Sequence, residues 1–143
     1  MTQLVLPVAR LTLAGAQTIL QGGIAKAEEM GVPQCLTVVD AGGNTVAFAR
    51  MDGARFLSEL SSKAKAVTAA SSGTRTGGSR AEAELKLALA TGGAMTNLNG
   101  GLPIVVDGEV IGAVGVGSGT GQQDVEVAEA AIAAFHARLH VQS

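Results

Sequence analysis

The sequence is poor in aromatic and charged residues. Its 143 residues include no Trp, no Tyr and three Phe, and 15% of them are charged, against about 25% in typical domains. A net charge of -2 supplies no basic surface, and three phenyl rings offer few stacking positions for bases. We therefore expect no nucleic-acid binding. The low charge content also hints that neighbouring subunits cover some apolar surface.

Disulfides and long hydrophobic runs are absent as well. The single cysteine, Cys35, cannot form an internal disulfide and is compatible with the cytosol. The chain does not begin with a basic segment followed by an apolar run, and no stretch approaches the roughly 18 apolar residues of a membrane span. We expect a cytoplasmic protein without a signal peptide or a membrane segment.

The abundant residues of the chain are small or aliphatic. Hydrophobic residues make up 47% of it, and glycine accounts for 20 of 143 residues, roughly twice the usual share of about 7%. This composition excludes intrinsic disorder, which combines low hydrophobicity with high net charge. The length corresponds to about one domain, so we expect a single domain over 1–143.

Apolar residues at three- and four-residue spacing predict helices. Three such patterns cover 12–30, 56–70 and 124–140, and a shorter one covers 81–90. Thr12 is a plausible cap of the first helix. The two longer connections between these segments are polar and rich in glycine.

The strands are predicted in hairpins. β-rich runs joined by short turns cover 35–50 and 102–116, and Asp107-Gly108 in the second favours a type I′ turn. Residues 1–10 predict an extended arm or a short edge strand, because Pro7 cannot donate to a ladder. Hairpins that do not alternate with helices predict an α+β fold with one antiparallel sheet, not a doubly wound parallel one.

Several motifs together resemble one family. The strings VVDAGGNTVAFARMDGA (38–54), KAVTAA (65–70) and GGLPIVVDGEVIGAVGVGSGTGQQD (100–124), with the last helix, resemble the GlcG/HbpS family, whose members are relatives of the PduO C-terminal domain. The resemblance implies a profilin-like α/β/α sandwich with a five-stranded antiparallel sheet flanked by helices. It also implies homo-oligomers and, for some members, binding of haem or related tetrapyrroles. Many members have no established activity.

Two departures from the family pattern bear on the ligand. Where the family often reads Val-Ser-Gly-Gly, this chain has Val-Gly-Ser-Gly over 116–119, so the hydroxyl is displaced by one position. Haem-binding relatives use a histidine of the first helix, and 12–30 contains none. Haem would need another axial ligand, such as Met51, Met95, Thr120 or a histidine of a partner subunit. We leave the cofactor unassigned.

The glycine-rich segment 115–121 follows a predicted strand and precedes a predicted helix. Backbone N–H groups at such a place can hold a carboxylate, aided by the helix dipole. The alternative is a tight connection in which Asp124 caps the helix. A nucleotide loop is disfavoured, because Thr120 stands where a third glycine is needed and the chain has no Gly-Lys-Ser/Thr.

Two cationic side chains are further candidates. Arg50 presents a planar fork that suits a carboxylated ligand, or it pairs with Asp40 or Asp52 and stabilises the hairpin. Lys65 lies among Ala, Val and Thr, where an amine can serve as a base or a Schiff-base former. Alternatively, Lys65 extends its charge to solvent or bridges two subunits.

Other features favour structural roles. His136 and His140 have metal-ligand spacing, but no glutamate follows the first histidine and no third ligand is evident, so we predict no metal site. A lone Cys35 in an apolar strand is typical of a small core residue. Glycines 22 and 23 inside a helix favour close packing or a subunit contact over a flat ligand.

Two functions remain open, together with a scaffold role. The first is a small-molecule-binding protein for a tetrapyrrole or another flat carboxylated molecule. Its predicted ligand-binding residues are Arg50, Met51, Pro103, Gly115, Gly117, Ser118, Gly119 and Thr120. The second is an isomerase, tautomerase or lyase. There Lys65 with Asp40 or Asp124 would transfer protons, and the loop amides would stabilise an enolate.

Overall fold

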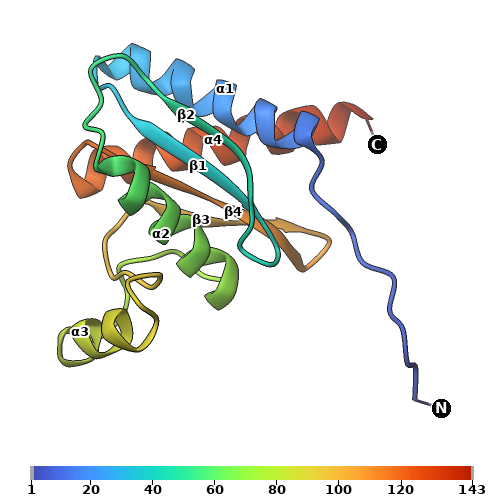
Figure 1. The fold of residues 1–143 in the computed structure, drawn as a ribbon. Coiled ribbons are helices and arrows are strands. Elements are labelled where there is room, and N and C mark those ends of the chain that lie inside the picture. The colour runs from blue at the N-terminus through green and yellow to red at the C-terminus, as the bar shows by residue number, and fades with distance from the viewer. Residues whose placement is uncertain (1, 143) are drawn as a thin grey trace.

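The computed structural model describes residues 2–142 of the chain; residue 1, which the predicted arm includes, and residue 143 lie outside the described residues. The helices and strands appear in the predicted order (Figure 1). Their bounds are α1 Leu13–Met30, β1 Cys35–Asp40, β2 Thr45–Arg50, α2 Ser58–Ser72, α3 Ala81–Ala90, β3 Gly101–Val106, β4 Glu109–Gly117 and α4 Gly121–Gln142.

The strands form one antiparallel sheet in the order β2-β1-β4-β3. This confirms the predicted α+β fold with an antiparallel sheet. The expected fifth strand is wrong, because the sheet in residues 2–142 has four strands. The remaining candidate strand, residues 2–10, is exposed along its whole length and pairs with no strand.

Helices cover both faces of the sheet (Figure 1). Helices α1 and α4 pack on one face and α2 packs on the other. Because side chains alternate along a strand, the two faces differ. The large-residue face carries aliphatic side chains under α1 and α4: Leu36, Val38, Val114 and Val116. The small-residue face lies under α2 and carries Thr37, Val39, Ala113, Gly115 and Gly117.

Glycine is needed on the small-residue face because α2 approaches the sheet closely. A Cβ added at Gly115 would collide with the carbonyl oxygen of Ser62 and the amide of Ala66. A Cβ at Gly117 would lie 3.0 Å from the Ser61 hydroxyl. Part of the glycine excess therefore serves helix-on-sheet packing, and these positions do not face a ligand.

Local signals predict several turns and helix ends. Asp107 and Gly108 have φ values of 50° and 80°, and a type I′ turn requires positive φ at both positions. The Thr12 hydroxyl accepts a hydrogen bond from the Gly15 amide at 3.0 Å, so Thr12 caps α1 as predicted.

The two glycines inside α1 also serve close packing. A Cβ at Gly22 would collide with Ala134 of α4, and one at Gly23 would collide with Leu36 of β1. The space beside them is filled by the chain itself, so the structure favours packing over a flat ligand at this place.

Helix α3 lies apart from these layers. None of its residues is buried, and it projects from the body at the lower left of Figure 1. Among residues 2–142, no helix has the length and apolar character needed to cross a bilayer.

Candidate functional site

Strands β1, β2 and β4 have ends that lie side by side at one end of the sheet. Cys35, the first residue of β1, pairs with Arg50 at the end of β2 and with Gly117 at the end of β4. We call this end of the sheet the Cys35 end. It brings together Arg50, Met51 and the loop 118–120, which the sequence predicts as ligand-binding residues.

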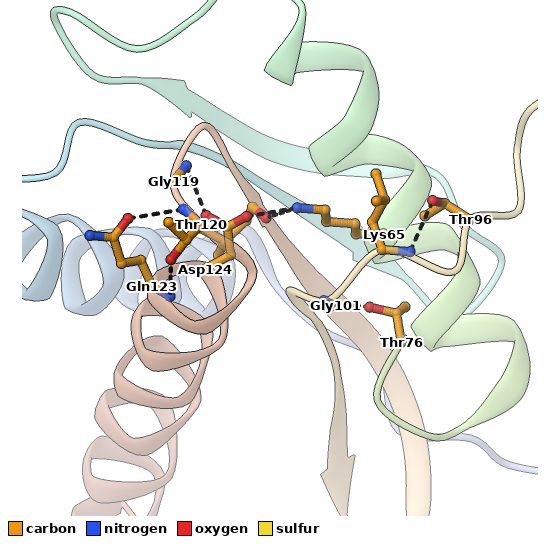
Figure 2. Close-up of polar contacts among 10 residues, drawn as sticks. Lys65, Thr76, Thr96, Gly101, Gly119, Thr120, Gln123 and Asp124 are labelled. Atoms are coloured by element: carbon orange, nitrogen blue, oxygen red, sulfur yellow. Dashed lines mark hydrogen bonds and ion pairs between the residues drawn. The ribbon is translucent and has the colours of Figure 1, made fainter. Parts of the chain in front are cut away.

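A buried ion pair lies behind this loop (Figure 2). The Lys65 ammonium donates to Asp124 Oδ2 at 2.9 Å and to the carbonyl oxygen of Val116 at 2.7 Å. The side chains of Lys65 and Asp124 are 5% and 3% exposed. Since Lys65 belongs to α2 and Asp124 to α4, the pair joins the layers on the two faces of the sheet around the end of β4.

The backbone amides of the loop donate hydrogen bonds to side chains of α4. The Gly119 amide donates to Asp124 Oδ1 at 3.0 Å, and the Thr120 amide donates to Gln123 Oε1 at 2.9 Å (Figure 2). In return, the Gln123 amide donates to the Thr120 hydroxyl at 3.2 Å. This is a capping box of Thr-x-x-Gln type. The amides at 119 and 120 are therefore occupied, and the structure favours the tight connection over an anion cradle there.

The same geometry weakens the enzyme hypothesis. A base or Schiff-base former must reach its substrate with a free amine. The Lys65 amine is closed off from solvent and held by a carboxylate and a carbonyl. The structure therefore gives proton transfer by Lys65 no support.

Asp40 lies at the opposite end of β1, where it pairs with Gly112. Its Oδ1 accepts from the amides of Gly42 at 2.9 Å and Asn44 at 3.0 Å. The hydrogen bond from the Asn44 amide is the main cause that lowers the pKa of Asp40 below its ordinary value. Asp40 stabilises the β1–β2 turn and is not brought near Lys65.

The predicted ligand-binding residues divide into two groups. Gly115 and Gly117 are buried under α2, and Pro103 pairs with Ala113 within the sheet. The others lie at the Cys35 end, where Thr120 is exposed and the rest are at least partly exposed: Arg50, Met51, Ser118, Gly119 and Thr120.

An exposed apolar surface adjoins this second group. Phe56, Leu57 and Leu60 are 70%, 65% and 70% exposed, and we call them the Phe56 patch. Arg55 precedes the patch, and its amide donates to the Ser118 hydroxyl at 2.9 Å, which ties the patch to the loop. Sequence reasoning missed this patch, because exposure of an apolar residue depends on the tertiary fold.

Cys35 lies close to Arg50, its partner on β2, and to the backbone of Arg55. Its thiol lies 3.7 Å from the carbonyl oxygen of Arg55. Burial raises the pKa of the Cys35 thiol, while the nearby Arg50 guanidinium acts in the opposite direction. The guanidinium of Arg50 and the backbone of Arg55 therefore both lie near Cys35, and both arginines are exposed to solvent.

Gln34 is a second residue that sequence reasoning missed. Its side-chain amide is fully buried, and neither its Oε1 nor its Nε2 has a hydrogen-bond partner among the described residues. A Cβ built on Gly119 would lie 2.9 Å from Nε2, so the amide lies directly beneath the loop. An unpaired buried amide costs about 1–3 kcal/mol.

The side chains of the described residues bear on metal and haem ligation. Within residues 2–142 there is no group of three or more His, Cys, Asp and Glu side chains suited to a metal ion. Helix α1 contains no histidine, and its Gly22 and Gly23 are covered by Ala134 and Leu36. Helix α1 therefore offers no imidazole as an axial ligand for haem.

Comparison with known proteins places this fold in a family. A family model described as haem degrading protein HbpS-like matches residues 11–133. An uncharacterized 15.0 kDa protein of Citrobacter freundii is 42% identical over 141 residues, covering 90% of this chain and 94% of that protein. Protein GlcG of Escherichia coli K12 is 39% identical over 102 residues, covering 71% and 76%.

Solved structures of similar proteins support the same family. Protein ORFY of Klebsiella pneumoniae has a TM-score of 0.89 and 34% identity, covering 96% of this chain and 98% of that one. A structure described as a PduOC:Heme complex has a TM-score of 0.82 and 27% identity, covering 88% and 95%. The resemblance carried by the sequence motifs is confirmed, and the chain belongs to the HbpS-like family.

Proposed function

We propose that this chain binds a flat, carboxylated small molecule at the Cys35 end, with a tetrapyrrole as the first molecule to test. The apolar body of the ligand would lie on the Phe56 patch, and Arg50 and Arg55 would hold its carboxylates. The observation that carries this proposal is the exposed patch beside two exposed arginines.

The physical argument starts from the exposure of the patch. Three large apolar side chains are 65–70% exposed. Full burial of such a side chain contributes up to about 1.5–3 kcal/mol to the free energy of binding. Exposed apolar surface rimmed by polar residues is typical of a binding site. A guanidinium binds a carboxylate through two parallel hydrogen bonds. Patch and arginines together therefore fit a flat body with acidic substituents.

The relatives support the class of ligand. The family description names haem, and one similar structure is described as a complex with heme. Because α1 of this chain offers no histidine, we attribute binding to the apolar face and the carboxylates of the ligand. Met51 and Thr120 are the side chains at the Cys35 end that would approach an iron. A metal-free porphyrin then tests the proposal without any axial ligand.

The experiment is a titration with protoporphyrin IX, followed by absorbance and fluorescence. The wild-type chain should saturate at micromolar porphyrin. Arg50→Ala/Arg55→Ala should raise the Kd at least about tenfold, since charge-assisted hydrogen bonds contribute about 1.5–3 kcal/mol each. Arg80→Ala is the matched control, because Arg80 is an exposed arginine at α3, and it should bind like wild type. No saturation, or an unchanged Kd in the double variant, would overturn the proposal.

Haemin in a parallel titration separates iron ligation from recognition of the flat acid. If Met51 ligates the iron, Met51→Ala should weaken haemin binding and leave protoporphyrin IX binding unchanged. If Met51→Ala weakens the binding of haemin and of protoporphyrin IX equally, Met51 contributes an apolar contact instead.

A further inference from the structure

The N-terminal arm, residues 2–10, carries apolar side chains that the other described residues leave mostly exposed. Leu4, Val5, Leu6 and Val8 are 94%, 83%, 65% and 76% exposed. Figure 1 shows the arm leaving the body and running away from it. Within residues 2–142, no backbone hydrogen bond involves the arm. Among the described residues, the backbone of the arm has no hydrogen-bond partner, and its large apolar side chains are mostly exposed.

An apolar groove lies where the arm meets the body. A cavity of about 300 Å³ is bounded by the start of α1, the end of α4 and the β3–β4 hairpin. This volume is at the small end of the range of about 300–1,000 Å³ for small-molecule pockets. Its apolar walls include Leu11, Val106, Ile111, Phe135 and Leu139.

We propose that two copies of this chain exchange their arms, so that Leu4–Val8 of each copy fills this groove of the other. The inference is independent of the proposed ligand site. The groove includes Val106 and Ile111 beside the β3–β4 turn, whereas the Phe56 patch adjoins the other end of β4.

The position of the groove favours a second copy as its occupant. In a two-fold dimer the same residues of both copies meet near the axis. In the proposed dimer the two-fold axis passes beside the groove, so each arm, which joins the body at Ala9 and Arg10 on the rim of its own groove, reaches the groove of the partner. Folding back onto its own groove would need a tight chain reversal within the few residues between Leu4 and Ala9, where the groove begins.

Chemistry and size are also suitable. Residues 2–9 carry no charged side chain, so the arm itself brings no ion into the groove. The arm residues 4–8 and the thirteen groove residues share no position. About eighteen residues of each copy therefore take part, which approaches the 20–30 residues a side of a stable interface.

Analytical ultracentrifugation of the full chain over a concentration series tests the exchange. The wild type should form dimers or even-numbered assemblies. Leu4→Asp/Leu6→Asp should raise the dimer Kd at least about a hundredfold, because each substitution places a charge in the groove. Thr2→Asp/Gln3→Asp adds the same charge at the polar tip of the arm and should leave the assembly largely intact. A wild type that is monomeric throughout, or equal association of the Leu4→Asp/Leu6→Asp variant, would overturn the proposal.

A cross-link distinguishes exchange from an arm that folds back. In the Leu6→Cys/Arg138→Cys chain, mild oxidation should join two copies covalently, since Arg138 lines the groove and the natural Cys35 is buried. A disulfide within one chain would show that each arm occupies its own groove and would contradict the exchange.

Discussion

The two faces of the sheet are packed by different means. On the large-residue face, aliphatic side chains of the strands meet α1 and α4 and fill the core by volume. On the small-residue face, α2 lies against glycine and alanine, and two of its buried polar side chains have polar partners: Ser62 bonds with Thr37 of β1, and Lys65 bonds with Asp124 of α4. One face therefore depends on side-chain volume, and the other on close approach and on paired polar groups.

This difference explains the buried lysine. A helix that approaches a sheet over glycine leaves little room for large apolar side chains, so its long residue reaches past the end of β4 to a partner on α4 (Figure 2). Buried ion pairs add little net stability compared with apolar residues, but they are costly to break. The pair also fixes α2 relative to α4 behind the loop 118–120.

The largest effect is expected from breaking that pair. Asp124→Ala leaves a buried ammonium without its carboxylate and the Gly119 amide without its acceptor. We expect a loss of about 3–5 kcal/mol in the free energy of unfolding, measured by urea denaturation.

The control for this prediction replaces both charges. Lys65→Met/Asp124→Leu removes the unpaired charge and should recover much of the loss, because apolar pairs of similar size substitute well for buried ion pairs. A loss below about 1 kcal/mol in Asp124→Ala would show that the pair is not the connection between the layers described above.

On the large-residue face, removal of volume is the sensitive change. Leu36 is fully buried in the core, and Leu36→Ala should cost about 2–5 kcal/mol by urea denaturation. Val105→Ala is the control, since Val105 lies in the sheet but is 38% exposed, and it should cost much less. Equal losses would contradict the assignment of the core to this face.

On the small-residue face, addition of volume is the sensitive change. Gly115→Ala adds a methyl group that collides with the α2 backbone, and we expect a loss of about 1–3 kcal/mol. A Cβ at Gly78 would meet no atom within 4 Å, so Gly78→Ala should be nearly neutral in the same denaturation assay. Full tolerance of Gly115→Ala would contradict the close approach of α2.

The smallest effect is expected at Asp40, which belongs to the turn and to neither face. Its folded-state pKa is lowered by the Asn44 amide, so its contribution to stability is present above the unfolded pKa of about 3.9. That contribution disappears as the pH falls through the lowered folded-state pKa. Asp40→Asn should therefore be slightly less stable than wild type at neutral pH, and the difference should narrow below about pH 4. A difference independent of pH in denaturation between pH 2 and 7 would contradict this assignment.

Local pattern was sufficient for most of the fold. The bounds of β1, β2 and α3 match the predicted ranges, and the Asp107-Gly108 turn has the expected geometry, because these features depend on neighbouring residues. The fifth strand was expected from the family resemblance. Residues 2–10 do not form it, since an edge strand also requires a partner that residue patterns do not reveal.

The site was predictable only in part. Lys65 and Asp124 were both candidates, but their contact spans 59 residues and depends on how α2 and α4 pack. The capping box at 120–123 has a local signal, the Thr-x-x-Gln pattern, because both of its hydrogen bonds join residues three apart. The exposure of Phe56 beside Arg55 and the isolation of the Gln34 amide arise only from the tertiary arrangement.

The binding of a flat acid at the Cys35 end is tested most directly by nuclear magnetic resonance. The ¹⁵N-labelled chain would be titrated with protoporphyrin IX while backbone amide shifts are followed. We expect the largest shifts at Arg50, Met51 and residues 55–60, with the amides of the β3–β4 turn unaffected. Shifts centred on α1 and α4, or no saturable shifts, would contradict it.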